Sequence, residues 1–216
     1  MKAIGIDIGT TTISGVVLDV EKKHVVEAKT IQNDSFISTD NNWERVQDVS
    51  VILEKAQALV DELLDHCPDC ISIGLTGQMH GILYIDQKGE CVSPLYTWQD
   101  GRGNLSEFGG KSIVELVKEE TGLAVSTGYG LITHLYHCKK DMVPELAVSF
   151  CTIGDYLGMK LADRAAPVVH ASNAASLGFF DGSKCAFRQD IIEKMGMNSR
   201  MLPEITDEFE ILGQYK

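Results

Sequence analysis

A turn near the N-terminus combines residue types that bind phosphate groups. Asp7 lies near the end of a strand-like run, and Gly9, Thr10, Thr11 and Thr12 follow it. Glycine lets a backbone approach a ligand, threonines offer N–H and hydroxyl groups to an anion, and a nearby carboxylate can hold Mg²⁺ through water. An ordinary hairpin turn would use the same residues. A Walker A loop and a dinucleotide fingerprint are excluded, because neither glycine pattern is present and a strand follows.

A second cluster follows a predicted strand and has side chains that suit a polyol. Gln78, Met79 and His80 lie between Gly77 and Gly81, and they offer an amide, a thioether and an imidazole. A solvated histidine in a hairpin connection is the simpler interpretation of this cluster alone. Pockets in layered α/β folds collect at strand ends, which favours a ligand site here.

A third cluster also comes directly after a predicted strand. Trp98 offers an apolar ring for the carbon face of a sugar, while Asp100 and Arg102 offer an acceptor and a fork of donors for hydroxyl groups. The alternative is a surface salt bridge beside a core tryptophan. Because the second and third clusters both follow strands, together they favour a polyol site more than either does alone.

The six cysteines are scattered along the chain and do not form a dense disulfide framework. Cys67 and Cys70 fit a Cys-x-x-Cys template, which suggests a redox pair or half of a zinc site. No second pair follows at zinc spacing, and the motif comes after a helix and before a strand, opposite to a thioredoxin-like arrangement. We therefore expect free thiols in a reducing cytoplasm.

Composition limits the classes of function. The chain has 216 residues, a formal net charge of −12, 44% hydrophobic and 23% charged residues. These values are typical of a soluble globular protein with one large or two small domains, and they argue against disorder or a membrane span. The acidic balance argues against nucleic-acid and anionic-membrane partners, although Mg²⁺ can still bridge acidic side chains to a nucleotide.

Hydrophobic periodicity predicts an α/β layered domain with a mixed sheet. Alternating residues predict strands over 4–8, 13–20, 24–31 and 71–77, and the first three form an antiparallel meander because only short turns join them. Three shorter strands are expected over 82–85, 95–98 and 148–152.

Helical periodicity predicts five helices between and after these strands. The longest covers 46–64, with Asn41 and Glu44 resembling a capping box and Pro68 just beyond its end. The other helices are expected over 112–120, 132–139, 154–161 and 189–195. Strands flanked by helices are typical of a layered α/β architecture.

The motifs, taken in order, resemble the FGGY family of carbohydrate kinases nearly from end to end. The matching segments are 7–11, 77–81, 97–102, 121–122 with 127–130, 154–157 and 172–176. Gln78-Met79-His80 resembles the ketose kinases such as xylulokinase, whereas 98–102 with 173–176 and 201–205 is most similar to sedoheptulokinase. Glycerol kinases carry Gln-Arg-Glu at 78–80, which disfavours glycerol as substrate.

The resemblance implies a fold and a set of roles. The fold is the ribonuclease H-like fold of the actin/Hsp70/sugar-kinase superfamily, with helices on both faces of the sheet. The reaction is transfer of the γ-phosphoryl group of ATP to a sugar hydroxyl with Mg²⁺. Asp7 would position the metal and the attacking hydroxyl, and Gly9 to Thr12 would face the ATP phosphates. The implied substrate-binding residues are Gln78, Met79, His80, Trp98, Asp100, Arg102, Tyr129 and Asn173, the last with a structural role as an alternative.

The resemblance also implies that the chain is one part of a kinase. The family's general base is an aspartate in a Gly-Asp segment that follows the last motif matched here, and Gly154-Asp155 belongs to a different motif. We therefore expect residues 1–216 to be the N-terminal, sugar-binding domain, inactive without its ATP-binding C-terminal domain. The expected partners are a ketose, ATP and that missing domain, with a homodimer left open.

Three other functions stay open at this point. The first is a non-catalytic sugar-binding or regulatory relative that has kept the pocket. The second is an ATPase of the superfamily that acts on proteins, for which the cluster of Gln78-Met79-His80 with Trp98 and Arg102 would have no purpose. The third, a thiol oxidoreductase using Cys67 and Cys70, has the opposite strand and helix order to its template.

Overall fold

The computed structural model describes residues 1–209 and 211–215, and the chain forms two compact units. Unit 1 consists of Met1–Phe36 and Asp48–Gln78, and unit 2 consists of Ile37–Gln47 and Met79–Lys216. The chain therefore passes from one unit to the other three times.

Unit 1 is a four-stranded mixed sheet with one long helix. The sheet order is β3-β2-β1-β5, in which β1 pairs antiparallel with β2 and parallel with β5. These elements are β1 (Lys2–Ile8), β2 (Thr12–Asp19), β3 (His24–Gln32), β5 (Cys70–Gly77) and α1 (Val49–His66). The predicted opening meander and the α/β class with a mixed sheet are confirmed.

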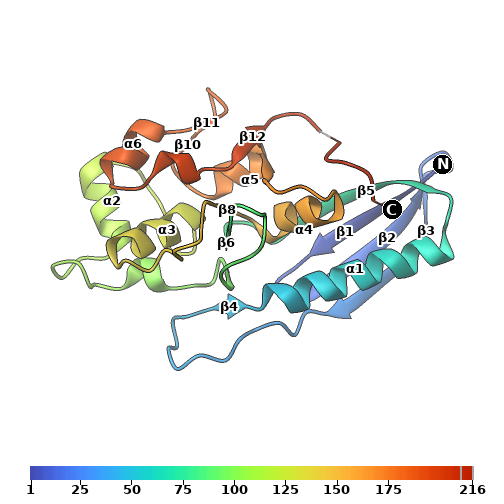
Figure 1. Ribbon diagram of the computed structural model, residues 1–216, viewed down its shortest axis with the longest axis horizontal. Helices are drawn as coiled ribbons and strands as arrows, with labels where there is room; N and C mark the ends of the chain where they lie inside the picture. Colours follow the sequence, from blue (N-terminus) through green and yellow to red (C-terminus); the bar gives the residue numbers. More distant parts are fainter. Residues whose placement is uncertain (210, 216) are drawn as a thin grey trace. The chain divides into compact units, whose positions relative to one another are not determined.

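Helix α1 covers one face of this sheet because both surfaces are apolar (Figure 1). The antiparallel register places Ile6 opposite Gly15, and a Cβ at Gly15 would lie 2.6 Å from Leu63 of α1. A larger residue at Gly15 would therefore force the end of the Leu63 side chain to shift. Asp7 comes next along β1 and points to the opposite face, since successive strand residues alternate.

The predicted start of the long helix is wrong by three residues. Asp48 caps α1, and its carboxylate accepts hydrogen bonds from the N–H groups of Ser50 and Val51. Val46–Gln47 instead forms β4, which pairs with β7 (Leu95–Tyr96). The apolar spacing from Val46 to Val49 fits a helix by coincidence, because Val46 is buried through strand pairing.

Unit 2 contains many short elements, and its apolar core is built from β6, β8, α3 and α4. Strands β6 and β8 pair antiparallel, and β9 pairs parallel with β12. The remaining elements of this unit are β6 (Leu83–Ile85), β8 (Ser149–Cys151), β9 (Val168–His170), β10 (Phe180–Asp181), β11 (Ala186–Phe187), β12 (Glu204–Thr206), α2 (Ile113–Thr121), α3 (Gly130–Lys139), α4 (Ile153–Leu161), α5 (Ala171–Ser176), α6 (Gln189–Lys194) and 3₁₀ turns at Arg102–Asn104 and Ser199–Met201.

Local capping explains where two helices of unit 2 begin. Ser112 and Glu115 form a reciprocal capping box at α2, and Thr152 and Asp155 form another at α4. The predicted helices over 112–120, 132–139, 154–161 and 189–195 correspond to α2, α3, α4 and α6. None of the helices among the described residues is long and apolar enough to cross a membrane.

Candidate functional site

In unit 1, Asp7 presents an exposed carboxylate near the end of β1. It lies opposite Ser14 of β2 and Thr76 of β5 in the sheet register. Its neighbours across the strands are therefore two small hydroxyl side chains, which leave room around the carboxylate.

Asn33 stabilises the adjacent Gly9–Thr12 turn through hydrogen bonds. Its side-chain Nδ2–H donates to the carbonyl of Gly9 at 2.8 Å, and its backbone N–H donates to the carbonyl of Thr11 at 2.9 Å. The hydroxyl of Ser35 donates to Asn33 Oδ1 at 2.6 Å, which fixes the orientation of the amide. Two carbonyl oxygens of the turn are thus engaged by protein donors and do not face an anionic ligand.

Gln78 supports the same turn. Its backbone N–H donates to the carbonyl of Ile8 at 2.8 Å, and Thr10 Oγ1 donates to its side-chain Oε1 at 3.2 Å. A Cβ at Gly9 would lie 2.9 Å from the carbonyl oxygen of Thr12, so only glycine fits the tight turn. The structure brings Gln78 to the threonine turn, whereas Met79 and His80 belong to unit 2.

The turn and Asp7 fit a phosphate group and a magnesium ion. Mg²⁺ typically keeps several waters and takes one or two carboxylates together with substrate phosphates. Asp7 is such a carboxylate, and the carbonyls of Gly9 and Thr11 are tied to Asn33. Within residues 1–209 and 211–215, no group of three or more histidine, cysteine or acidic residues is arranged to hold a metal. Asp7 is the carboxylate beside the Gly9–Thr12 turn that would hold such an ion.

In unit 2, His80 occupies a strained turn that fixes its imidazole. Its φ is +70°, and the N–H of Gly81 donates to the carbonyl of Met79, which closes a γ-turn around it. Its Nδ1 lies 2.6 Å from the carbonyl oxygen of Ser176, and its backbone N–H donates to Ser176 Oγ. A carbonyl oxygen only accepts, so Nδ1 carries the proton and a neutral ring presents Nε2 as an acceptor.

An aromatic stack extends this position. The rings of His80 and Tyr129 are stacked with centroids 4.8 Å apart and an interplanar angle of 8°. Tyr129 precedes α3 and also lines an open pocket of about 330 Å³ with Phe179 and Arg188. Next to Tyr129, Gly128 has a φ of +81°, and a Cβ there would lie 2.0 Å from the carbonyl oxygen of Trp98. The backbone contact at Gly128 and the stack on Tyr129 thus join the segments that carry Trp98 and His80.

Two of the predicted sugar residues are exposed. The side chain of Trp98 is 47% exposed and that of Met79 is 44% exposed. Both side chains are available to contact a ligand, because the Trp98 ring and the Met79 thioether are not fully packed into the core of the unit.

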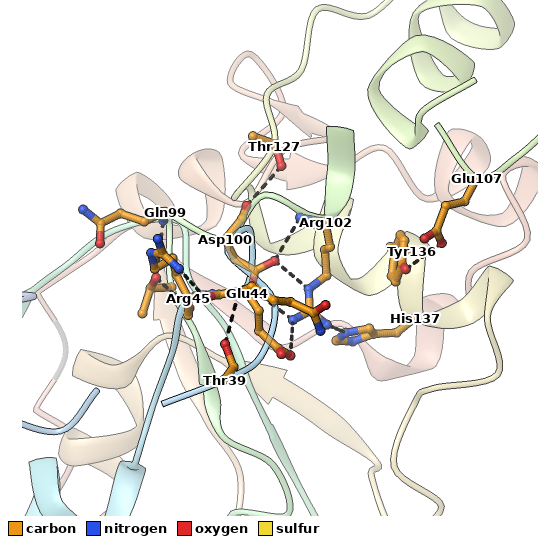
Figure 2. Close-up of polar contacts among 12 residues, drawn as sticks. Thr39, Glu44, Arg45, Gln99, Asp100, Arg102, Glu107, Thr127, Tyr136 and His137 are labelled. Carbon is orange, nitrogen blue, oxygen red and sulfur yellow. Dashed lines mark hydrogen bonds and ion pairs between the residues drawn. The ribbon is translucent and has the colours of Figure 1, made fainter. Parts of the chain in front are cut away.

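Asp100 and Arg102 lie in a different environment, since both are fully buried. Arg102 Nε donates to Asp100 Oδ1 at 2.6 Å and Nη2 donates to Oδ2 at 3.0 Å, which is a bidentate pair. Figure 2 shows the guanidinium between Asp100, Glu44 and His137, with Nη2 donating to Glu44 Oε1 at 3.3 Å and Nη1 bonded to His137 Nε2. These contacts direct the two groups toward protein atoms.

The charge of Arg102 is retained inside the protein. Burial alone would lower its pKa, but the hydrogen bonds and charge of Asp100 outweigh burial and raise the pKa of the guanidinium. The guanidinium also lies over the ring of Tyr96, 4.4 Å from its centroid. The alternative interpretation predicted a salt bridge at the surface. Asp100 and Arg102 do form a salt bridge, but it lies in the core of unit 2.

Asn173 lies in α5 and contacts the cap of α4. Its Nδ2 donates to Asp155 Oδ1 at 3.4 Å, and its carbonyl accepts from Ser176 Oγ at 2.7 Å. Burial raises the pKa of Asp155, and hydrogen bonds from Thr152 and Asn173 oppose that rise. Asn173 is thereby linked to His80 through Ser176, whose hydroxyl group contacts both residues.

Comparison with known proteins agrees with this arrangement of motifs. Residues 2–216 match the profile of the N-terminal domain of the FGGY family of carbohydrate kinases. The chain belongs to the FGGY family. A sedoheptulokinase of Mus musculus is 30% identical over 239 residues, which cover 98% of this chain and 48% of the mouse protein. A xylulose kinase of Staphylococcus xylosus is 24% identical, over 98% of this chain and 44% of that protein.

The fold of the FGGY chain is also that of solved sugar kinases. A gluconate kinase from Lactobacillus acidophilus superposes with a TM-score of 0.84 at 20% identity, covering 100% of this chain and 44% of that one. The ribonuclease H-like fold is therefore confirmed. The FGGY chain spans about half the length of the curated relatives it matches.

Three residues that position the FGGY motifs escaped prediction from the sequence. Asn33 lies 24 residues from Gly9, and Ser176 lies 96 residues from His80. Glu44, predicted to cap a helix, instead bonds to Arg102 across 58 residues. These contacts join segments distant in the sequence, so no local period marks them, although Ser176 itself lies in the matched segment 172–176.

Proposed function

We propose that this chain is the N-terminal, sugar-binding part of an ATP-dependent kinase that phosphorylates a hydroxyl of a ketose similar to sedoheptulose or xylulose. The observation that carries the proposal is a cluster of aromatic side chains in unit 2 of this FGGY chain. There the ring of His80 stacks on Tyr129, and the neighbouring Gly128 contacts the backbone of Trp98. Similarity to a sedoheptulokinase supports a ketose as acceptor. We place the enzyme in the cytoplasm, with no nucleic-acid or membrane partner.

On the sugar side, the exposed residues have complementary tasks. The ring of Trp98 covers the carbon face of the sugar, and Met79 supplies a flexible apolar contact. Nε2 of His80 accepts a hydrogen bond from a sugar hydroxyl, since Nδ1 donates to Ser176. Asp100 and Arg102 position Trp98 from within the protein, and Asn173 positions His80 through Ser176.

On the nucleotide side, the turn and Asp7 act by position and charge. Gly9 to Thr12 lie against the phosphates, with Asn33 and Gln78 keeping the turn in shape. Asp7 would hold the hydrated ion and would orient the attacking hydroxyl. Mg²⁺, when bound, supplies charge neutralisation for the transferring phosphoryl group. The protein contributes alignment and electrostatics, with little covalent chemistry.

The remaining half of the kinase supplies the other groups that the reaction requires. A general base must accept the proton of the sugar hydroxyl, and we assign it to an aspartate beyond residue 216. We assign most of the adenosine site to the same C-terminal domain, so residues 1–216 alone should show no turnover. The test is ADP release by the complete gene product with sedoheptulose, xylulose, ribulose and glycerol. Failure with all four would favour a non-catalytic sugar-binding relative.

Replacing Trp98 with alanine should raise the KM for the ketose about 30-fold, since about 2 kcal/mol of apolar contact is lost. The KM for ATP should change much less, because Trp98 belongs to the sugar-side cluster. Steady-state kinetics of the complete gene product, with each substrate varied in turn, measure the two values. Phe36→Ala is a matched control, since Phe36 is another exposed aromatic residue, 41% exposed. An equal rise in both KM values would remove Trp98 from the sugar pocket.

Replacing Asn33 with alanine should raise the KM for ATP about tenfold, because the turn loses its hydrogen bond to the Gly9 carbonyl, worth about 1 kcal/mol, and its alignment. The ketose KM should stay near the wild-type value. Ser35→Ala is the control, since it removes only the bond that orients the Asn33 amide and should have a smaller effect. A rise confined to the ketose KM would contradict the assignment of the turn to phosphates.

A further inference from the structure

A line of buried polar side chains leads from Arg102 into the core of unit 2. Nη1 of Arg102 bonds to Nε2 of His137, and Nδ1 of His137 lies 3.0 Å from Oη of Tyr84. The same Oη lies 2.8 Å from Nδ1 of His134, whose Nε2 lies 3.6 Å from Sγ of Cys138. Tyr84, His134 and His137 are each at most 1% exposed.

The direction of every hydrogen bond in this line is determined by Arg102. A guanidinium only donates, so Nε2 of His137 accepts and Nδ1 of a neutral His137 carries the proton. That proton is donated to Oη of Tyr84, which leaves the single Tyr84 hydroxyl proton to be donated to Nδ1 of His134. His134 therefore carries its proton on Nε2, which faces Cys138.

The electrostatic environment keeps both histidines neutral. Burial, which is the largest cause, and the nearby charge of Arg102 lower the pKa of His137 to about 3. Burial lowers the pKa of His134 to about 4. Burial also raises the pKa of Tyr84 well above its usual value, so its hydroxyl stays protonated. The arrangement of protons is accordingly the same throughout the neutral pH range.

Arg102 is the point at which this line meets the sugar-side segments. Through Asp100 it is tied to residues 43–45, because Asp100 Oδ2 accepts from the N–H of Arg45 at 3.0 Å. The carbonyl of Asp100 accepts from Thr127 Oγ1 at 3.1 Å, two residues before Tyr129 (Figure 2). Trp98 lies two residues before Asp100, so the ion pair holds the segments of both aromatic residues.

We infer that His137, supported by Tyr84 and His134, is a positioning residue for sugar binding: its unprotonated Nε2 holds the Arg102 guanidinium, and thereby Trp98 and Tyr129, in place. The inference rests on the proposed function and names a residue that touches neither sugar nor nucleotide. His137 acts by orienting Arg102, and the direction of the whole line follows from that single contact.

Kinetics of His137 variants test this role. His137→Phe keeps a planar ring but removes the acceptor for Nη1. It should raise the ketose KM on the order of 10-fold, the loss expected when one hydrogen bond to a charged group is removed. His137→Gln can place an acceptor oxygen near the former Nε2 and should restore most of the affinity. The ATP KM should stay near wild type in both. Lys139→Ala, an exposed change on the same helix, is the control.

A merely structural role would give a different result. If His137→Phe lowers the melting temperature without changing the ketose KM, or raises both KM values equally, the inference is overturned. If His137→Phe fails to fold, the comparison of His137→Gln with wild type decides, because it should show near-normal ketose KM only if an acceptor suffices.

Long-range ¹H–¹⁵N NMR of the wild-type protein is a second readout, independent of activity. It should show His137 protonated on Nδ1 and His134 protonated on Nε2, with both unchanged between pH 6 and 8. A proton on Nε2 of His137 would overturn the inference. The NMR result stands even if the complete gene product phosphorylates none of the ketoses tested, so failure of the proposed function is distinguishable from failure of this one.

Discussion

Replacing Asp7 with asparagine should lower kcat of the complete gene product by about 100- to 1000-fold, the loss typical of removing one group that stabilises transition-state charge. Asparagine has the same shape, so the variant removes a charge and leaves β1 unchanged. Asp7 is exposed and lies opposite Ser14 and Thr76, so the fold does not depend on its carboxylate. The ketose KM should change little, because the groups assigned to the sugar are in unit 2.

The measurement is steady-state turnover at saturating ATP and ketose over a range of Mg²⁺ concentrations. Higher Mg²⁺ should recover part of the lost rate, since weaker binding of the ion is one component of the defect. Glu21→Gln is a matched control, because it also removes one exposed carboxylate charge from unit 1. A variant with wild-type kcat would remove Asp7 from the reaction.

Replacing Arg102 with methionine should lower the free energy of unfolding by about 3–5 kcal/mol, because it leaves the carboxylate of Asp100 buried without its partner. Lysine should not substitute well, since an ammonium cannot reproduce the two parallel bonds of the guanidinium. Urea denaturation of the wild type and of each variant measures the loss. Arg200→Met, an exposed change of the same chemistry, should have almost no effect.

A double variant separates the cost of the unpaired charge from the value of the pair. Asp100→Asn together with Arg102→Met removes both charges, and it should be more stable than Arg102→Met alone. The double variant could instead be less stable than the wild type by the sum of the losses in the two single variants. In that case the two residues act independently and do not form a buried pair.

The sequence predicted the elements with strong periods and missed those that depend on distant partners. Alternation over residues 4–8 and 13–20 predicted the strands that became β1 and β2. The same reasoning placed Val46 in a helix. Over a single helical turn, the spacing of buried apolar residues does not distinguish a strand residue from a helix residue. β9 and β12 went unpredicted, since each is three residues long and pairs only with the other.

The candidate site shows a similar limit. The order of the motifs predicted the family, and chemical type predicted Asp7 and Trp98 as candidates that are exposed in the structure. Spacing predicted that Asp100 and Arg102 are close, but not that both are turned inward. Which way a charged pair faces depends on acceptors such as Glu44 and His137, which no local pattern connects to residue 102.

The three crossings of the chain between its units constrain how this protein can be recombined. Phe36 and Ile37, Gln47 and Asp48, and Gln78 and Met79 are neighbours in sequence but belong to different units. A chimera that takes the Trp98 and His80 cluster from one relative and the Asp7 turn from another therefore needs three junctions, not one. The last junction separates Gln78 from Met79, so a transplanted unit 2 resumes at Met79, and Gln78 stays with the recipient's Thr10.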